Sequence, residues 1–305
     1  MATNAPTAPE HVLIVGGTGR TGRRLVRHLL DDGFEVTAVV RDLDKAQLTI
    51  GNESEHPHLN IVQGDLEDVE PWAHALQGVS QVVTAVSCGV STDPLVVLGA
   101  RNSPKPLPHQ VDGDGIEMLA NKAKEHGVRR FVAVTTASAG NAWSPAAILL
   151  NTIHSFSVRE KWRGEQAIRR SGLDYIILRP YGLGHDVTPA ELGFPAARGI
   201  GWSQDGRPAG ASRRIPRDDV AKLCHEALLV PPGEAPRSTV ECWATNEHVE
   251  SMPWGSLKPD PGGALPEVDH TTAVLVSLGG LSLVGGGVLH CAWRAGRVAM
   301  RWLRR

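Results

Sequence analysis

Residues 11–22 read HVLIVGGTGRTG, and this stretch decides the fold. Four apolar residues, Val12–Val15, run directly into a glycine-rich turn and then into the helical pattern RRLVRHLLDDG. The glycines fit both G-x-G-x-x-G and the looser G-x-x-G-x-x-G, with Gly22 as the last glycine of each. Glycine lets the chain turn tightly and lets a pyrophosphate approach the backbone, and the following helix offers free N–H groups to the anion. A strand before this turn and a helix after it predict nucleotide binding.

Composition narrows the class of protein. The chain has 305 residues, 31 of them basic and 33 acidic, so its net charge of −2 gives no field that would attract nucleic acid. The four cysteines form no C-x-x-C and the histidines no H-E-x-x-H, so neither a disulfide framework nor a metal site is expected. The first ten residues, MATNAPTAPE, lack the features of a signal or transit peptide. We expect a disordered lead-in over 1–10 and a cytoplasmic location.

Strand and helix patterns alternate through the first 180 residues. This alternation predicts an α/β protein with a doubly wound parallel sheet, the Rossmann arrangement. The expected strands are Val12–Val15, Glu35–Val40, Leu59–Gln63, Gln81–Ala85, Arg130–Thr135 and Asp174–Leu178. The expected helices are Gly22–Leu30, one that starts at Asp42, Val69–Leu76, Gly115–Glu125 and Ser157–Arg170, whereas Gly89–Gln110 is expected to be a loop.

The pattern loosens after Pro180, with one further helix at Asp218–Leu229 and one strand at Ser238–Ala244. We therefore expect a domain over 11–245 whose substrate lobe lies mainly in 181–245. A Pro/Gly-rich linker, 246–272, would then lead to an apolar C-terminal helix and a basic tail, 273–305.

The end of the second strand predicts which cofactor is bound. In dinucleotide folds an Asp or Glu at this place holds the ribose 2′-hydroxyl of NAD. Val40 occupies it here, followed by Arg41, which could pair with a 2′-phosphate. Asp42 is an alternative acid, but its position suits the cap of the next helix. The sequence thus favours NADP over NAD, and the candidate ligands from the two turns are Gly16, Thr18, Gly19, Arg20, Thr21, Gly22 and Arg41.

Several segments together resemble the atypical short-chain dehydrogenase/reductases of the NmrA-like, NAD(P)-binding kind. They are VLIVGGTGRTGRRLV, EVTAVVRDLDKA, GDLED, HGVRRFVAVTTASAG, KWRGEQAIRRSGLDYIILRPYGL and IPRDDVAKLCHEAL, spread over residues 11–245. The resemblance implies that Asp65 and Leu66 line the adenine and that Ala85 and Val86 pass under the adenosine and pyrophosphate. It also implies that further residues surround the nicotinamide, namely Thr135, Thr136, Pro180, Tyr181 and Leu183.

The chain departs from the Tyr-x-x-x-Lys pair of carbonyl-reducing members, in which tyrosine donates a proton and lysine holds the ribose. Lys161 aligns with that lysine, but Ser157 stands four residues before it, and serine is a poor general acid. Tyr181 is a candidate substitute acid. The candidate catalytic residues are therefore Lys161, Tyr181, Ser157 and Thr136, with Lys161 also in the cofactor set.

Residues 273–293 carry no charged side chain, and the following RAGRVAMRWLRR carries five arginines. The length suits one crossing of a bilayer, yet the glycines and His290 weaken insertion. A membrane anchor, an interfacial segment or hairpin, and a buried or partner-bound helix all remain open for 273–305.

Two functions fit these observations. One is an NADPH-dependent reductase of a small or lipophilic carbonyl, enone or quinone. The other is a non-catalytic protein that senses NADP or acts as an assembly scaffold for a protein partner. The stretch Gly184–Arg213, which would shape a substrate pocket, has no readable motif.

Overall fold

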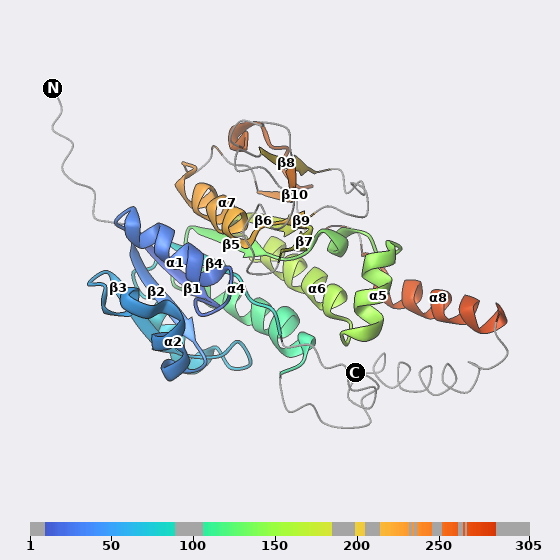
Figure 1. Ribbon diagram of the computed structural model, residues 1–305, viewed down its shortest axis with the longest axis horizontal. Coiled ribbons are helices and arrows are strands. Elements are labelled where there is room, and N and C mark those ends of the chain that lie inside the picture. Colours follow the sequence, from blue (N-terminus) through green and yellow to red (C-terminus); the bar gives the residue numbers. More distant parts are fainter. Residues whose placement is uncertain are drawn as a thin grey trace.

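The computed structural model describes residues 10–88, 106–184, 199–204, 214–231, 234, 237–245, 252–261, 265 and 267–284, the last seven as backbone only. Eight strands form one sheet in the order β3-β2-β1-β4-β5-β6-β10-β8 (Figure 1). Seven are parallel, and β8 runs antiparallel to β10 at the edge. The bounds, in sheet order, are Leu59–Gln63, Glu35–Val40, His11–Val15, Gln81–Thr84, Arg130–Val134, Asp174–Pro180, Ser238–Thr245 and Gly199–Ser203.

Helices cover both faces of the sheet, as a parallel sheet requires. Alternate residues of β1 divide between two cores: Val12 and Ile14 belong to one, and Leu13 and Val15 to the other. The first core is closed by α1 (Gly22–Asp31), α2 (Leu43–Ile50) and α7 (Arg217–Leu229), and the second by η2 (Glu70–Leu76), α4 (Ile116–Glu125) and α6 (Ser157–Arg170). The doubly wound parallel sheet predicted from the sequence is confirmed.

The expected substrate lobe is described only in part. Two short strands, β7 (Gly182–Leu183) and β9 (Arg214–Ile215), pair in parallel after the main sheet. Residues 185–198 and 205–213 make up most of the stretch Gly184–Arg213, which has no readable motif. They lie outside the described residues. The boundaries of the lobe and of the domain stay predictions.

The segment expected to be a linker is fastened to the domain where the structure describes it. Met252 and Leu257 are buried in the first core, and η6 (Trp254–Ser256) lies between them. Asp260 accepts hydrogen bonds from Arg169 at 3.1 Å and from the backbone N–H of Thr239 at 3.1 Å. We call residues 252–261 the strap, because Asp260 fastens this segment to α6 through Arg169 and to β10 through Thr239.

The last described helix, α8 (His270–Val284), begins at the end of the strap region and lies against α5 (Pro145–Ile153). No helix in the part of the chain that the structure describes is both long and apolar enough to span a bilayer. Residues 285–305 of the expected helix and basic tail lie outside the described residues.

Three elements near the site were not expected from the sequence. They are a π-helical turn, η3 (His109–Gly115), a short 3₁₀ turn, η4 (Ala137–Gly140), and helix α5. A further 3₁₀ turn, η1 (Gly51–Glu55), follows α2 elsewhere in the domain. The side-chain oxygen of Asn151, near the end of α5, accepts hydrogen bonds from the backbone of Val158 and Arg159. Asn151 thereby satisfies N–H groups in the first turn of α6 across a turn in which Ser155 and Phe156 have positive φ.

The acid stability of the fold should depend on His270. This side chain is 1% exposed, and its Nε2 and Nδ1 lie 3.0 and 3.2 Å from Ala139 O and Asn151 Nδ2. The amide nitrogen donates to Nδ1, so the ring is neutral, and burial lowers the pKa of His270 below 6.5. The folded state therefore keeps its full stability, as far as His270 is concerned, above pH 6.5. Below pH 6.5 the unfolded state takes up a proton at this histidine and the folded state does not, so the free energy of unfolding falls as the pH is lowered.

We therefore expect the free energy of unfolding in urea to fall from pH 7 to pH 5, with a limiting slope of about 1.4 kcal/mol per pH unit for one histidine. His270→Gln should be less stable at pH 7 and should show a shallower slope. His11, His154 and His225 have lowered pKa values as well, so some slope will remain. An unchanged slope in His270→Gln would contradict the assignment.

Candidate functional site

The glycine turn joins β1 to α1 at the carboxyl end of the parallel strands. Gly16 has φ +93°, and a Cβ there would lie 2.9 Å from the carbonyl oxygen of Ala85, so only glycine fits. A Cβ on Gly22 would collide with the carbonyl oxygen of Gly16. Gly22 is thus needed for contact between the first turn of the helix and the loop, which is the packing role that the dinucleotide fingerprint gives to its last glycine.

Substitutions at Gly19 and Gly22 should therefore have different effects. Gly22→Ala forces backbone apart and should lower the free energy of unfolding by about 1–3 kcal/mol. Gly19 lines the cavity described below and a Cβ there lies 3.0 Å from Gly16 O, so Gly19→Ala should fold with a loss below about 1 kcal/mol and bind dinucleotide at least about tenfold more weakly. Urea unfolding and cofactor titration of both variants test this. Equal stability of the two variants would contradict it.

A cavity of about 150 Å³ opens beside the glycine turn. It brings together residues that the sequence placed in the cofactor site: Gly16, Thr18, Gly19, Arg41, Asp65, Leu66, Ala85 and Val86. It also includes residues that the sequence analysis did not select, among them Lys45, Ser87, Cys88 and Val111. The other predicted cofactor residues lie outside this lining: Arg20, Thr21, Gly22, Thr135, Lys161, Pro180 and Leu183. The contacts of all these residues with a dinucleotide stay predictions.

The end of β2 presents cations to this cavity. Val40 is 2% exposed, whereas Arg41 lies on the surface with its Nε 3.9 Å from Asp65 Oδ2. Asp42 accepts a hydrogen bond from the backbone N–H of Lys45 at 2.9 Å, so it is the N-cap of α2, as predicted. Because this carboxylate is occupied by the cap, it does not supply the acid that NAD sites place here. Lys45, one turn into the helix, adds a second cation to the cavity wall.

Lys161 lies on α6 and is bonded to Val86, one of the residues that line the cavity. Its Nζ donates to the carbonyl oxygen of Val86 at 3.2 Å and to Asp112 Oδ1 at 2.7 Å. Asp112 is 3% exposed, and its Oδ2 has no hydrogen-bond partner among the described residues. Burial, together with the neighbouring Asp112, raises the pKa of the Cys88 thiol to about 12, so this cysteine stays protonated. Cavity, carboxylate and ammonium thus meet at one place.

The π-helical turn explains how Asp112 comes to face α6. Turns of this kind recur at functional sites because they redirect a side chain within a helix. Glycines let η3 approach closely: a Cβ on Gly164 would collide with the carbonyl oxygen of Asp112, and one on Gly115 would lie 2.5 Å from Leu66 O. The sequence HQVDGDG carries a weak signal of this packing, since Gly113 and Gly115 lie in the turn, ahead of a helical pattern.

Behind the site, Glu165 joins the ends of β5 and β6 to α6. Thr135 Oγ1 donates to Glu165 Oε1 at 2.6 Å, and Arg179 binds both carboxylate oxygens at 3.0 and 2.6 Å. Burial alone would raise the pKa of Glu165, but Arg179 and Arg169 hold it below its ordinary value. Thr135, expected beside the nicotinamide, is therefore fixed by a buried ion pair.

The other candidate catalytic residues take separate places. Tyr181, just after β6, donates its hydroxyl to Glu241 Oε2 on β10 at 3.0 Å. Ser157 is the first residue of α6, one turn before Lys161, and Thr136 precedes η4. Pro180 is buried at the end of β6 and Leu183 lies exposed in β7. Their catalytic and binding roles stay predictions.

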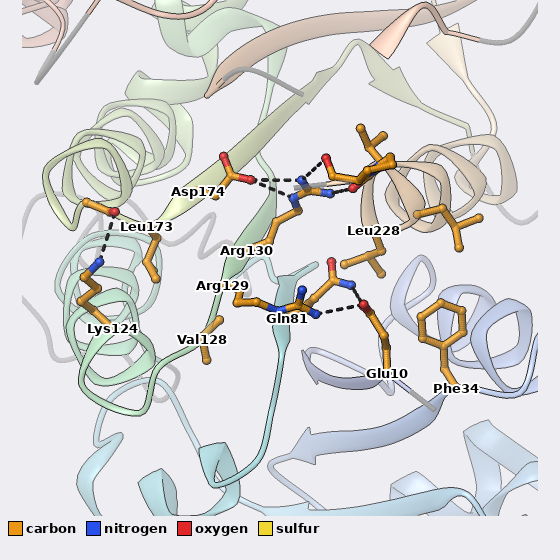
Figure 2. A pocket seen from close by; sticks show the side chains of 14 residues that line it. Glu10, Phe34, Gln81, Lys124, Val128, Arg129, Arg130, Leu173, Asp174 and Leu228 are labelled. Atoms are coloured by element: carbon orange, nitrogen blue, oxygen red, sulfur yellow. Dashed lines mark hydrogen bonds and ion pairs between the residues drawn. The ribbon is translucent and has the colours of Figure 1, made fainter. Parts of the chain in front are cut away.

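A larger cavity, of about 530 Å³, lies at the opposite, amino end of the strands (Figure 2). Its central guanidinium, Arg130, donates to Asp174 Oδ2 at 3.0 Å and to backbone carbonyls of α7 and the residues after it. Arg129 and Gln81 both donate to Glu10. These pairs hold β4, β5, β6 and α7 together. Because ligands of parallel sheets bind at the carboxyl ends of the strands, we do not take this cavity as the cofactor site. Among the described residues there is no group that could hold a metal ion.

Fold and glycine turn define a dinucleotide-binding protein, and comparisons with known proteins identify its family. A family described as NAD(P)H-binding matches residues 16–231. The chain is 32% identical over 226 residues to an uncharacterized chloroplastic protein of Arabidopsis thaliana, with 72% of each chain covered. It is 27% identical to the photosystem II assembly factor Ycf39 of Cyanophora paradoxa, over 55% of this chain and 44% of that protein.

A short-chain dehydrogenase/reductase of Veillonella parvula, solved in complex with NADP, shares the fold with a TM-score of 0.58 and 16% identity, over 80% of this chain and 99% of that chain. At this identity the likeness concerns the fold alone. The family match over more than half of the chain is decisive: the chain belongs to the NAD(P)H-binding family. The resemblance noted from the sequence is confirmed.

Proposed function

We propose that the protein binds NADPH in preference to NADH and reduces a conjugated carbonyl compound, an enone or a quinone. The observation that carries this proposal is the position of Lys161, an ammonium group bonded to the backbone of Val86 beside the dinucleotide cavity, with Ser157 one turn before it in place of a tyrosine. Tyr181, the substitute acid considered from the sequence, donates its hydroxyl to Glu241. The site therefore offers positive charge without an adjacent phenol.

The preference for NADPH follows from the end of β2. Val40 cannot accept a hydrogen bond from the 2′-hydroxyl of NADH, and one oxygen of Asp42 is already used by the helix cap. Arg41 and Lys45 line the cavity at the end of β2, and a planar guanidinium suits a 2′-phosphate well. The cavity fits a dinucleotide because its glycine turn leaves no Cβ between the backbone and the bound pyrophosphate.

Arg41→Ala should weaken NADPH binding by about 1.5–3 kcal/mol, the loss of a charged hydrogen-bonded pair. NADH affinity should change by less than about threefold, because NADH has no 2′-phosphate for the guanidinium. Titration of wild type and variant with both cofactors checks this. Arg23→Ala, on α1, is the matched control for a lost arginine. Equal wild-type affinities for NADPH and NADH would refute the preference.

The reduced nicotinamide supplies a hydride. An acceptor that receives a hydride becomes an anion, and its basicity decides what the protein must provide. A simple ketone gives an alkoxide, which needs a proton donor during the transfer. A quinone gives a phenolate, whose parent acid has a pKa of about 10, as in tyrosine, so this anion can form first and take its proton from water afterwards. The Lys161 ammonium donates to Val86 and to Asp112, so it would stabilise such an anion with its charge and its one remaining N–H donor.

Asp112 acts on this lysine as a positioning residue. Its Oδ1 and the Val86 carbonyl oxygen fix Nζ beside the cavity, at 2.7 and 3.2 Å. The second oxygen of Asp112, Oδ2, is buried and does not contribute to the fixing of the lysine. Held in this way, the ammonium needs little reorganisation when negative charge forms beside it.

A steady-state assay separates the acceptor classes. Wild-type protein with NADPH should oxidise the cofactor in the presence of a benzoquinone or a cyclic enone, and at least about 100-fold more slowly with a saturated ketone of the same size. Arg41→Ala should raise the KM for NADPH in the same assay. NADPH oxidation by the saturated ketone at the rate of the quinone would overturn the proposal.

The second function is supported by a specific comparison. The relative from Cyanophora paradoxa is a photosystem II assembly factor, so a member of this group can serve assembly rather than turnover. If tight NADPH binding is found without oxidation by any acceptor of the panel, the protein is better described as a cofactor-sensing or scaffold protein that binds a protein partner.

A further inference from the structure

The surface of α5 and the start of α8 is apolar. Five large side chains are well exposed there: Trp143 55%, Leu149 58%, Ile153 41%, Leu275 39% and Val276 54%. Helices α5 and α8 contact one another, at the end of the molecule away from α1 and α2 (Figure 1). We call these five residues the α5–α8 face. A contiguous apolar surface of this kind marks an interaction site rather than the usual scatter of single exposed residues.

The absence of charge extends beyond the five side chains. No Asp, Glu, Lys or Arg occurs between Phe131 and Val158, a stretch that contains all of α5. On α5, Leu149 and Ile153 are four residues apart and therefore share one side of the helix. By contrast, the exposed Leu48 of α2 has Asp44 and Lys45 on the same helix, as an ordinary surface residue would. Helix α5 thus lacks the polar outer side of a solvated helix.

The sequence that continues from α8 indicates what covers this face. Residues 273–293 contain no charged side chain, and 294–305 contain five arginines and no acid. In the sequence, α8 thus leads into an uncharged stretch and then into a cationic one that contains Trp302. Such a sequence suits the interface of a membrane with anionic lipids, to which each arginine adds about 1 kcal/mol. A second copy of the chain fits less well, because its own 294–305 stretch brings the same positive charge and no acid to pair with it.

We propose that the α5–α8 face is a membrane-docking surface, which lies on anionic lipid with the apolar side chains inserted at the headgroup boundary. Binding at the interface needs no spanning helix. Trp143 suits this position, since tryptophan is enriched where an apolar environment meets water. The proposal concerns where the protein binds and does not depend on whether it turns over NADPH.

Flotation of the full-length protein with vesicles tests the docking surface directly, in the absence of cofactor. Vesicles of phosphatidylcholine alone are compared with vesicles that also contain phosphatidylglycerol. The test variant is Leu149→Glu/Ile153→Glu, and the matched control is Leu48→Glu, because Leu48 is 86% exposed on α2, away from the face. Circular dichroism and urea unfolding confirm that both variants fold.

We expect wild type and Leu48→Glu to float with the anionic vesicles and to bind the neutral vesicles more weakly. Leu149→Glu/Ile153→Glu should bind the anionic vesicles at least about tenfold more weakly than wild type. Equal binding of wild type and the double variant would overturn the proposal, as would failure of wild type to bind anionic vesicles. A concentration-dependent dimer that the double variant abolishes, without vesicle binding, would assign the face to a second copy instead. If wild-type protein floats with anionic vesicles but does not oxidise NADPH with any acceptor, this result would count against the proposed reaction alone and not against the docking surface.

Discussion

Glu165→Ala is expected to lower the free energy of unfolding by about 3–5 kcal/mol, the range for removing one partner of a buried ion pair. The Glu165 carboxylate is fully buried and accepts hydrogen bonds from Arg179 at 3.0 and 2.6 Å and from Thr135 at 2.6 Å. Its Oε2 lies 3.3 Å from Arg169. Alanine would leave a cavity and two guanidinium groups without their shared anion.

The network around Glu165 makes this loss larger than that of a single contact. Arg169 also donates to Asp260 of the strap and to Thr239 on β10, and both arginines lie 5.4 Å from the centre of the Trp162 ring. One carboxylate therefore fastens α6, β6 and, through Arg169, the strap. We expect Glu165→Ala to loosen the strap, which limited proteolysis near Asp260 would detect.

Urea unfolding at pH 7 measures the effect, with Glu117→Ala as the control. Glu117 and Arg170 form an exposed pair at 3.8 Å, and such pairs contribute less than about 1 kcal/mol. Glu165→Gln, which keeps hydrogen-bonding capacity but not the charge, should fall between the two. If Glu165→Ala is no less stable than Glu117→Ala, the charge network does not hold the fold together.

Much of the sheet could be predicted from the sequence because its information is local. Strands such as Glu35–Val40 are short apolar runs bounded by turn residues, and parallel strands buried on both faces produce such runs. The cap at Asp42 was equally readable, since an acid directly before a helix favours that role. These signals span a few residues each.

The contacts that shape the candidate site are not local, which is why the sequence did not reveal them. Asp112 and Lys161 are 49 residues apart, and Gln166 and Leu265 are 99 apart. No spacing rule joins such pairs before the fold is known. The same reason explains why the contacts of the strap could not be predicted: its prolines and glycines indicate irregular backbone, but the bonds of Asp260 to Arg169 and Thr239 join residues far apart in the sequence.

Helix α5 was missed for a different reason. Its sequence, PAAILLNTI, has an apolar outer side, so it lacks the alternation of apolar and polar faces from which surface helices are predicted. A helix that looks buried in sequence but is exposed in the structure is the sign of an unfilled interface. The failure of prediction at α5 and the docking surface proposed there have one physical cause.

Replacing Lys161 should abolish most of the turnover while the dinucleotide still binds. Because Lys161→Met alone would leave Asp112 buried and unpaired, the informative variant is Lys161→Met/Asp112→Asn, which removes both charges together. We expect its kcat/KM for NADPH-dependent quinone reduction to fall by about 10²–10³, because the variant removes the ammonium group that would stabilise the developing phenolate.

Asp112→Asn alone separates charge from position. The amide can still accept a hydrogen bond from Nζ, so the ammonium stays near the Val86 carbonyl oxygen, and kcat/KM should fall by no more than about tenfold. NADPH titration of both variants shows whether binding survives, since Arg41 and the glycine turn are untouched. If the double variant turns over quinone at the rate of Asp112→Asn, Lys161 only supports the fold, and the charge that stabilises the reduced acceptor must come from another residue.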